Sequence, residues 1–243
     1  MSVFATLVEH LADLVQPLFG ATATAAAIVL FTMGVRLAVH PLSRAAARGQ
    51  KARTRLAPRL AELRKKHAKN PERMQKAIME LHAEEKVSPL AGCLPSLLQA
   101  PAFFLMFHLF SSGRMAGHSL FAAPLGDHYA DALSHGGPFG PAGLVYLVLF
   151  AIVGTVATYN YLRARRQQAV SPVAPVEPGQ PGAGVATAMA RYLPLLSFAT
   201  LLSVAAVPLA AALYIVTSTT WTAVERAFLY RDMPAAGALV TPA

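Results

Sequence analysis

Few residues in the 243-residue sequence have the types and spacing that catalysis or metal binding requires. The stretch GDHYADALSH places Asp127, Asp131 and His135 at helical spacing, so three potential ligands could share one face. We expect no metal there, because no cysteine joins the set. The apolar segments contain no glycine-rich phosphate loop, no HExxH zinc motif and no serine or cysteine beside an evident base. The sequence therefore predicts a protein that is not an enzyme, with no catalytic residue, no metal and no cofactor.

Arg36 is the residue with the clearest chemical potential, because the run around it, ATATAAAIVLFTMGVRLAVH, is otherwise suited to lipid. A charged side chain at the centre of a membrane helix costs about 3 kcal/mol on insertion scales, and such residues usually line polar pathways. One interpretation is that Arg36 extends its stem toward the lipid headgroups, at the limit of its reach. We favour the other, in which Arg36 faces a wet cavity and attracts an anion, because no acidic residue occurs in the predicted spans to pair with it.

Other polar residues in the apolar runs could line the same cavity. Thr32 lies one turn before Arg36 and on the same helical face. Further candidates are Gln99, Asn160, Thr217, Ser218, Thr219 and Thr220. For any single one of them, a hydrogen bond to its own helix or to a neighbouring helix is the more usual role.

The elements that position these residues are predicted to be transmembrane helices. The composition, with 55% hydrophobic and 14% charged residues, suits a bilayer better than a soluble domain. A hydrocarbon core is about 30 Å thick, which about 20 apolar residues can cross as a helix. Runs of that length occur at 21–42, 90–112 and 142–162.

The last apolar run, between Arg191 and Glu225, is too long for one crossing. Pro208 lies at its middle, where a proline can end one helix and begin the next. We predict two short spans, at 191–207 and 208–225, which local thinning of the bilayer would have to match. The predicted fold class is all-α: a polytopic membrane protein with five transmembrane helices around a cytoplasm-open polar groove, plus a cytoplasmic helical hairpin.

The hairpin is predicted from the first connection, residues 43–89. Asn70 caps its second helix, and Pro71 occupies the first helical position. Its two arms carry apolar stripes formed by Leu56, Leu60 and Leu63 and by Met74, Ile78 and Leu81. This basic hairpin could dock a ribosome, a nascent chain or anionic lipid, or it could be a solvated element that only sets topology; we weight the two interpretations equally.

Residues 1–20 are predicted to form an external amphipathic helix on a membrane surface, because their apolar residues follow helical spacing. These apolar residues are Phe4, Leu7, Val8, Leu11, Val15 and Leu18. A loosely ordered N-terminus is the alternative. The other connections are predicted as an external loop at 113–141, a cytoplasmic linker at 163–190 and a cytoplasmic tail at 226–243.

The charge distribution predicts how the protein is oriented. Apart from Arg36 and Arg114, all of the 21 lysines and arginines lie in the hairpin, the linker region or the segment after the last span. Because positively charged loops stay in the cytoplasm, we expect the N-terminus outside and the C-terminus in the cytoplasm. The net charge of +9 is then a property of the cytoplasmic loops, and we expect no direct binding to nucleic acid.

Three stretches resemble the YidC/Oxa/Alb family of membrane protein insertases, in the five-span form found in bacteria. They are VRLAVHPLSRAAARGQKARTRL, SPLAGCLPSLLQAPAFF and VPLAAALYIVTSTTW, and the resemblance runs from about residue 20 to residue 231. Ser88 stands for the usual asparagine of the second motif. In the third, Ala210 replaces the family's glycine and Ile215 replaces its second aromatic residue, whereas Tyr214 is retained. The departure at Ile215 puts the substrate contacts of that aromatic residue in doubt.

The resemblance implies an insertase and chaperone in the bacterial plasma membrane, whose groove arginine is Arg36 and whose substrate-contacting polar residue is Thr32. The groove residues expected from the spans and the resemblance together are Arg36, Thr32, Gln99, Asn160, Tyr214 and Ser218. Nascent membrane proteins and lipid are the expected partners, with the ribosome and the Sec translocon as further candidates, and we expect a monomer to be functional. The alternative from another class is a transporter that uses Arg36 to bind a small anion or solute; against it, no inverted repeat is visible.

Overall fold

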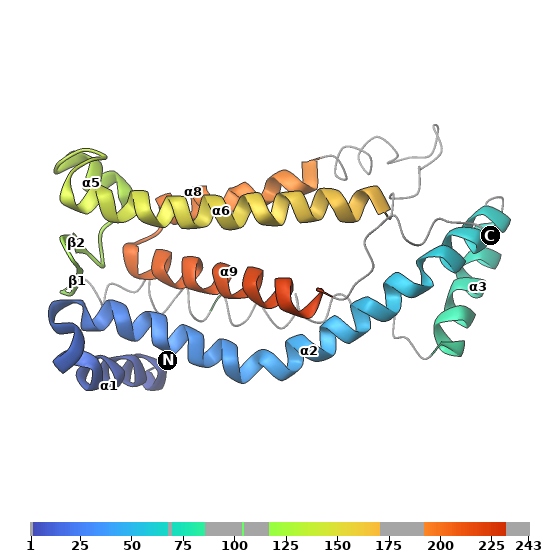
Figure 1. Ribbon diagram of the computed structural model, residues 1–243, viewed down its shortest axis with the longest axis horizontal. Helices are drawn as coiled ribbons and strands as arrows, with labels where there is room; N and C mark the ends of the chain where they lie inside the picture. Colours follow the sequence, from blue (N-terminus) through green and yellow to red (C-terminus); the bar gives the residue numbers. More distant parts are fainter. Residues whose placement is uncertain (1, 68–69, 86–103, 105–116, 171–191, 232–243) are drawn as a thin grey trace.

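The computed structural model describes residues 2–67, 70–85, 104, 117–170 and 192–231 (Figure 1). The predicted span at 90–112, which includes Gln99, lies outside these residues. The described part is mostly helical, with one small antiparallel hairpin of two strands, β1 (Ser119–Leu120) and β2 (Ala123–Pro124). The all-α prediction is therefore correct apart from this hairpin.

The centre of the fold is a bundle of long helices. They are α2 (Ala23–Lys66), α6 (Pro141–Val170) and α9 (Leu209–Leu229), and α9 lies between the other two (Figure 1). Two helical segments of the described part are long and apolar enough to cross a membrane, one at Thr6–Leu56 and one at Pro141–Arg166. This supports an all-helical membrane protein, and the count of five spans remains a prediction.

α9 is preceded by a short segment that runs back along α6. This segment consists of a 3-10 helix, η3 (Leu193–Phe198), and α8 (Ala199–Ala206), after which the chain reverses at Val207 and Pro208. α9 has 21 residues and so extends about 32 Å, which is longer than the short span expected at 208–225. The end of this helix was predicted at the first charged residue, Glu225, although charged residues occur readily inside helices. On the other side of the reversal, η3 and α8 cover Leu193–Ala206 in the described part of the chain.

The first turn of α9 is tied to a loop that we call the capping loop, residues 118–128. The backbone N–H of Leu209 donates to the carbonyl of Asp127, and that of Ala210 donates to the carbonyl of Leu125, both at 2.9 Å. The first N–H groups of a helix have no partner within the helix, so the loop satisfies them in an apolar setting. The side chains here are small: Ala210, Ala211 and Ala212 are fully buried, which lets neighbouring helices approach closely.

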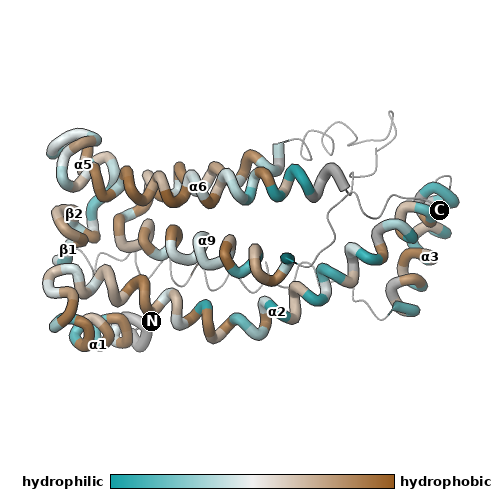
Figure 2. Tube along the Cα trace, viewed as in Figure 1, coloured by the Kyte–Doolittle hydropathy of each residue, from teal (hydrophilic) through white to brown (hydrophobic). Residues whose placement is uncertain are grey.

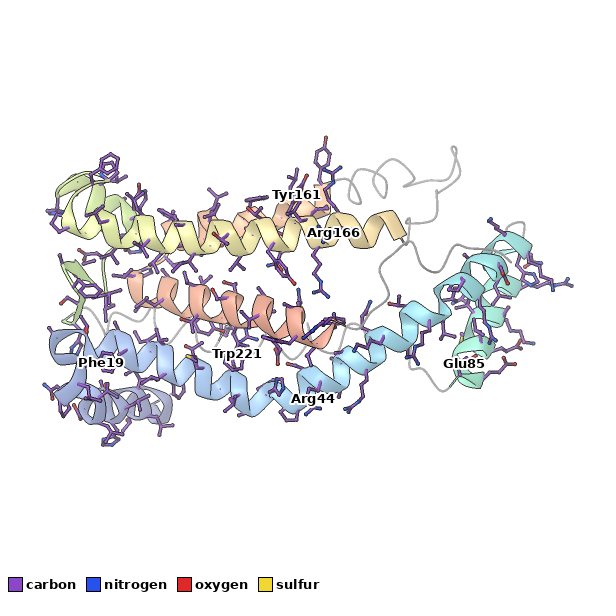
Figure 3. All side chains as sticks on the ribbon, in the orientation of Figure 1. Phe19, Arg44, Glu85, Tyr161, Arg166 and Trp221 are labelled. Atoms are coloured by element: carbon purple, nitrogen blue, oxygen red, sulfur yellow. The ribbon has the colours of Figure 1, made fainter. Side chains whose placement is uncertain are left out.

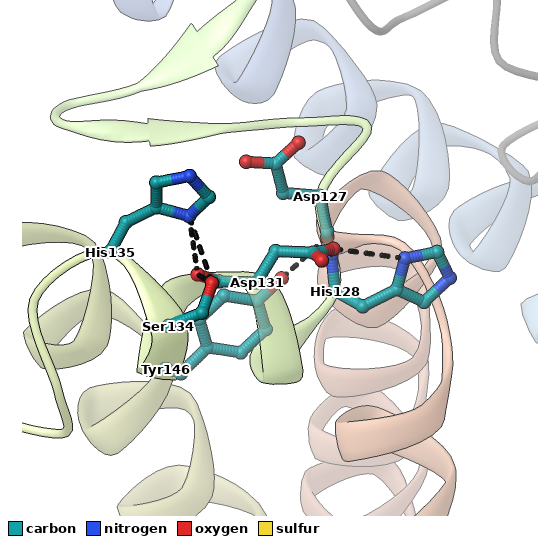
Figure 4. Close-up of polar contacts among 6 residues, drawn as sticks. All are labelled: Asp127, His128, Asp131, Ser134, His135 and Tyr146. Atoms are coloured by element: carbon teal, nitrogen blue, oxygen red, sulfur yellow. Dashed lines mark hydrogen bonds and ion pairs between the residues drawn. The ribbon is translucent and has the colours of Figure 1, made fainter.

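Tyr146 of α6 supports the capping loop from the other side. Its ring is fully buried, and its hydroxyl donates to the Asp127 carbonyl at 2.6 Å (Figure 4). The rings of Tyr146 and Phe150 both pack against Tyr129, at centroid distances of 5.4 Å and 5.0 Å. The Asp127 carbonyl thus accepts from both α6 and α9, and it joins the two helices at this end.

Asp131 organises the short helix that follows the loop, α5 (Tyr129–Ser134). Its carboxylate accepts the backbone N–H of His128 at 2.8 Å, and the His128 ring lies 3.5 Å from the same oxygen (Figure 4). His135, by contrast, contacts the Asp131 carbonyl and Ser134. The hydrogen bond from His128 N–H stabilises the ionised carboxylate and holds the pKa of Asp131 below its ordinary value of 3.8.

Acid is expected to loosen α5 through this carboxylate. A carboxyl whose pKa is lowered by folding contributes stability above its ordinary pKa, and the contribution disappears as the pH falls through the lowered value. Amide hydrogen exchange in residues 128–135, corrected for intrinsic rates, should therefore accelerate below pH 3.8 in the wild type. In Asp131→Asn the exchange should be faster already at neutral pH and should lack the acid step. The same acid step in both proteins would contradict the assignment.

The N-terminal helix, α1 (Ser2–Phe19), folds back along the first half of α2. The reversal uses Gly20, whose φ of +53° is a conformation that glycine adopts without strain. Within the predicted apolar stripe, Val8 and Val15 are buried against α2, whereas Leu7 and Leu18 are exposed. The helix itself is present as expected, and its position on an outer membrane surface remains a prediction.

Beyond the bundle, α2 continues into a projecting arm that packs against α3 (Pro71–Glu84) (Figure 1). No helix end separates the arm from the bundle, although α2 changes direction near Arg44, close to Pro41 (Figure 3). The cap of α3 is confirmed: the Asn70 side chain accepts the Arg73 N–H at 3.0 Å, with proline at the first helical position. Leu56 and Leu81 are buried, and hydrophilic and hydrophobic residues alternate along both arms (Figure 2).

Basic residues gather at one end of the bundle. Arg44 on α2 and Tyr161 and Arg166 on α6 lie at this end, and Phe19 lies at the other (Figure 3). Here Arg163 of α6 donates to the Arg226 carbonyl near the end of α9 at 3.2 Å, and its guanidinium lies 4.6 Å from the centre of the Tyr230 ring. Arg163 thereby fastens the last turn of α9 to α6.

Replacing Arg163 with glutamine is expected to loosen that turn. The variant loses a charged hydrogen bond and a cation–π contact, together about 1 kcal/mol at an exposed site, so amide exchange in residues 226–230 should rise about fivefold. Arg165→Gln is the matched control, because Arg165 contacts only Tyr161 of its own helix among the interactions described. Equal exchange in the two variants would show that Arg163 does not hold α9.

Candidate functional site

Arg36 reaches across from α2 to α9. Its Nε donates to the Ser218 hydroxyl at 3.1 Å, and its Nη2 also contacts that oxygen. The side chain is partly buried, and Ser218 is 5% exposed. The guanidinium is therefore held within the bundle by a neutral acceptor on a neighbouring helix.

Tyr214 completes this group, which we call the Arg36 cluster: Arg36, Ser218 and Tyr214. Tyr214 lies one turn before Ser218 on α9, it is buried, and the two side chains are hydrogen-bonded to each other. Because all three polar groups meet between two apolar helices, the cluster is a polar island that could interact with an acidic or hydrogen-bonding partner. The sequence argument named all three residues, and the structure brings them together.

The remaining candidates lie less close to this group. Thr32, one turn before Arg36, is fully buried, and its hydroxyl donates to the Ile28 carbonyl of its own helix at 2.7 Å. Thr219 likewise donates to the Ile215 carbonyl at 2.7 Å. The Asn160 side chain is partly buried on α6. For Thr32 and Thr219, the usual role of a hydroxyl in an apolar helix is thus the one observed.

One polar contact beside the Arg36 cluster was not predicted from the sequence. His40 lies one turn after Arg36 on α2, and its Nδ1 is 2.5 Å from the Glu225 carboxylate of α9. The Glu225 side chain is 9% exposed, compared with 37% for His40. The expectation that the spans hold no acidic residue near Arg36 was therefore wrong.

Two spacings in the sequence place His40 and Glu225 on the helical faces that carry the Arg36 cluster, although neither spacing shows that the two faces meet. Arg36 and His40 are four residues apart, and Ser218 and Glu225 are seven apart, so each pair lies on one helical face. Glu225 was interpreted only as the end of an uncharged run. In the folded protein α2 contacts α9, and the charge of Glu225 interacts electrostatically with Arg36.

Comparison with known proteins identifies the family of the chain that carries this site. Residues 14–236 match the model of the family described as 60Kd inner membrane protein. The chain belongs to the 60Kd inner membrane protein family. The match covers almost all described elements, including the helices that carry the Arg36 cluster.

Curated relatives in this family carry the name membrane protein insertase YidC, so the predicted resemblance is confirmed. The chain is 37% identical over 91 residues to the protein from Chlorobium limicola, 39% over 84 residues to that from Clostridium perfringens, and 38% over 96 residues to that from Nitrosospira multiformis. These alignments cover 37%, 35% and 40% of this chain. They span only 16%, 35% and 17% of the relatives' own lengths.

Of the three departures from the motifs of the resemblance, Ala210 and Ile215 lie in the core of α9, and Ser88 lies outside the described residues. Ala210 is fully buried under the capping loop, and Ile215 is 5% exposed. An isoleucine at this position packs as a core residue. Tyr214, which is retained, lies in the Arg36 cluster instead.

Proposed function

We propose that this protein is a membrane protein insertase and chaperone that acts without covalent chemistry. The observation that carries the proposal is the Arg36 cluster, a cationic polar group between two apolar helices of a chain in the 60Kd inner membrane protein family. The relatives named membrane protein insertase YidC support it. Nascent membrane proteins are the proposed clients.

The proposed route begins at the basic end of the bundle. A client's polar segment enters a groove between the helices there, attracted by Arg36 and accommodated by the hydroxyls of Ser218 and Tyr214, while its apolar segment contacts lipid. The capping loop and the buried alanines of α9 pack the opposite end. Partition of the client's apolar surface into lipid, about 25 cal/mol per Å², then drives release.

The membrane arrangement is part of the same proposal. Five helices cross the bacterial plasma membrane, with the N-terminus outside and the C-terminus in the cytoplasm, because the basic residues gather at one end. The arm of α2 and α3 then projects into the cytoplasm. A short span at 191–207, of which η3 and α8 are the described part, would thin the lipid locally and lower the barrier for a crossing segment.

A depletion experiment tests the proposal. Bacterial cells depleted of their own insertase receive the wild-type chain, and membrane insertion of a short client with an acidic outer segment is followed by protease accessibility. We expect insertion to be restored. In parallel, the purified protein in vesicles is tested for uptake of small anions, where we expect none.

The two readouts separate the classes of function. Restored insertion without anion uptake supports an insertase. Specific anion uptake without restored insertion would replace it with a transporter that uses Arg36. A chain that reaches the membrane in normal amounts and supports neither activity would contradict both.

A further inference from the structure

Two polar contacts join α2 to α9 along one line. Arg36 contacts Ser218, and one turn further along α2, His40 contacts Glu225. The helices run in the same direction through the bundle, so the Glu225 contact lies nearer the basic end (Figure 1). A polar segment that approached Arg36 from that end would pass Glu225 first.

Glu225 gives this passage a fixed negative charge. Its side chain is mostly buried, and it interacts electrostatically with Arg36. Charges removed from water are screened less by solvent and salt than exposed ones, so the carboxylate acts on neighbours at longer range than a surface residue would. The next residue, Arg226, is exposed and also interacts electrostatically with Arg36, with the opposite sign.

We infer that Glu225 is a specificity-determining residue of the proposed groove. Its carboxylate, held beside Arg36 by His40, offsets part of the attraction of Arg36 for acidic segments, so the groove accepts client segments with few acidic residues better than segments with several. Arg36 attracts anions, and Glu225 limits how strongly it does so. This inference rests on the proposed insertase function, and it adds the class of client segment that the groove accepts.

His40 gives the Glu225 carboxylate a partner on α2. Without a partner, a mostly buried carboxylate would be costly, and it would turn toward a cation such as Arg36, with which it interacts electrostatically. The 2.5 Å contact with His40 satisfies one carboxylate oxygen and holds the Glu225 side chain beside His40. Arg36 therefore keeps its contact with Ser218 while the negative charge stays beside it.

The test compares two clients that differ only in the translocated segment, one with four glutamates and one with four glutamines. Both are made in the same membranes, and the ratio of acidic to neutral insertion is measured, which removes differences in the amount of insertase. Glu225→Gln is expected to raise this ratio about threefold or more, because one repulsive charge disappears. Glu225→Asp, which keeps the charge, should leave the ratio at the wild-type value.

A second pair of variants distinguishes an effect of charge from an effect of altered folding. Arg226→Gln removes an exposed positive charge near the same site and should lower the ratio. Arg231→Gln changes an exposed arginine beyond the end of α9 and should not alter it. An unchanged ratio in both Glu225→Gln and Arg226→Gln would overturn the inference, as would an equal shift in Glu225→Asp and Glu225→Gln. If the wild type inserts neither client, the insertase function itself fails, which is a different outcome.

Discussion

Tyr146→Ala is expected to be the most destabilising single substitution in the described part of the chain. It removes a fully buried ring that packs against Tyr129, and it removes the hydroxyl that donates to the Asp127 carbonyl. Truncation of a buried aromatic residue to alanine costs about 3–5 kcal/mol. The loss should appear as a lower midpoint in a denaturant titration of the purified protein in detergent.

Two further variants separate the contributions. Tyr146→Phe keeps the ring and loses only the hydrogen bond, so we expect a cost of about 1 kcal/mol. Leu144→Ala changes an exposed residue on the same helix and should be nearly neutral in detergent. If Tyr146→Ala were as stable as Tyr146→Phe, the ring would not support the capping loop.

Arg36→Ala is expected to abolish insertion of a client with an acidic outer segment, whereas Arg36→Lys is expected to retain most of it. Lysine preserves the positive charge and one donor toward Ser218, although it lacks the two-point contact of the guanidinium. A charge in the bundle is the property that the proposed mechanism requires. The measurement is complementation of insertase-depleted cells, with client insertion followed by protease accessibility.

Arg44→Ala is the matched control for Arg36→Ala, because Arg44 is an exposed arginine on the same helix. It should support normal insertion. Ser218→Ala should give a partial defect, since Arg36 keeps its charge and loses its acceptor. If Arg36→Ala, Arg36→Lys and the wild type all insert the client equally, Arg36 is only an anchor in the bundle and the charge is dispensable for that client.

Local features of the fold were predictable from the sequence because they depend on neighbouring residues. The Asn70 cap needs only a side-chain acceptor three residues before Arg73, and Pro71 marks the start of the helix. The reversal before α9 follows from Pro208, which cannot continue a helix from α8. The exceptional character of Arg36 follows from the apolar run around it.

Features that depend on which helices meet were not predictable in the same way. The hydrogen bond between His40 and Glu225 joins residues 185 positions apart, and no local pattern indicates that α2 faces α9. The packing of α1 along α2 was missed for the same reason, since an amphipathic helix can bury its apolar face in lipid or against a neighbour. The length of α9 was underestimated because a charged residue was taken as a helix end.

The two ends of α9 are held by different chemical groups, and this makes them unequal under mutation. Its first turn is fixed by backbone N–H groups and backbone carbonyls, which every residue except proline supplies. Its last turns depend on the side chains of His40, Glu225 and Arg163. Substitutions can therefore change the strength of the side-chain contacts at the last turns of α9. The backbone hydrogen bonds at its first turn are kept under most substitutions, so that end of the helix stays attached.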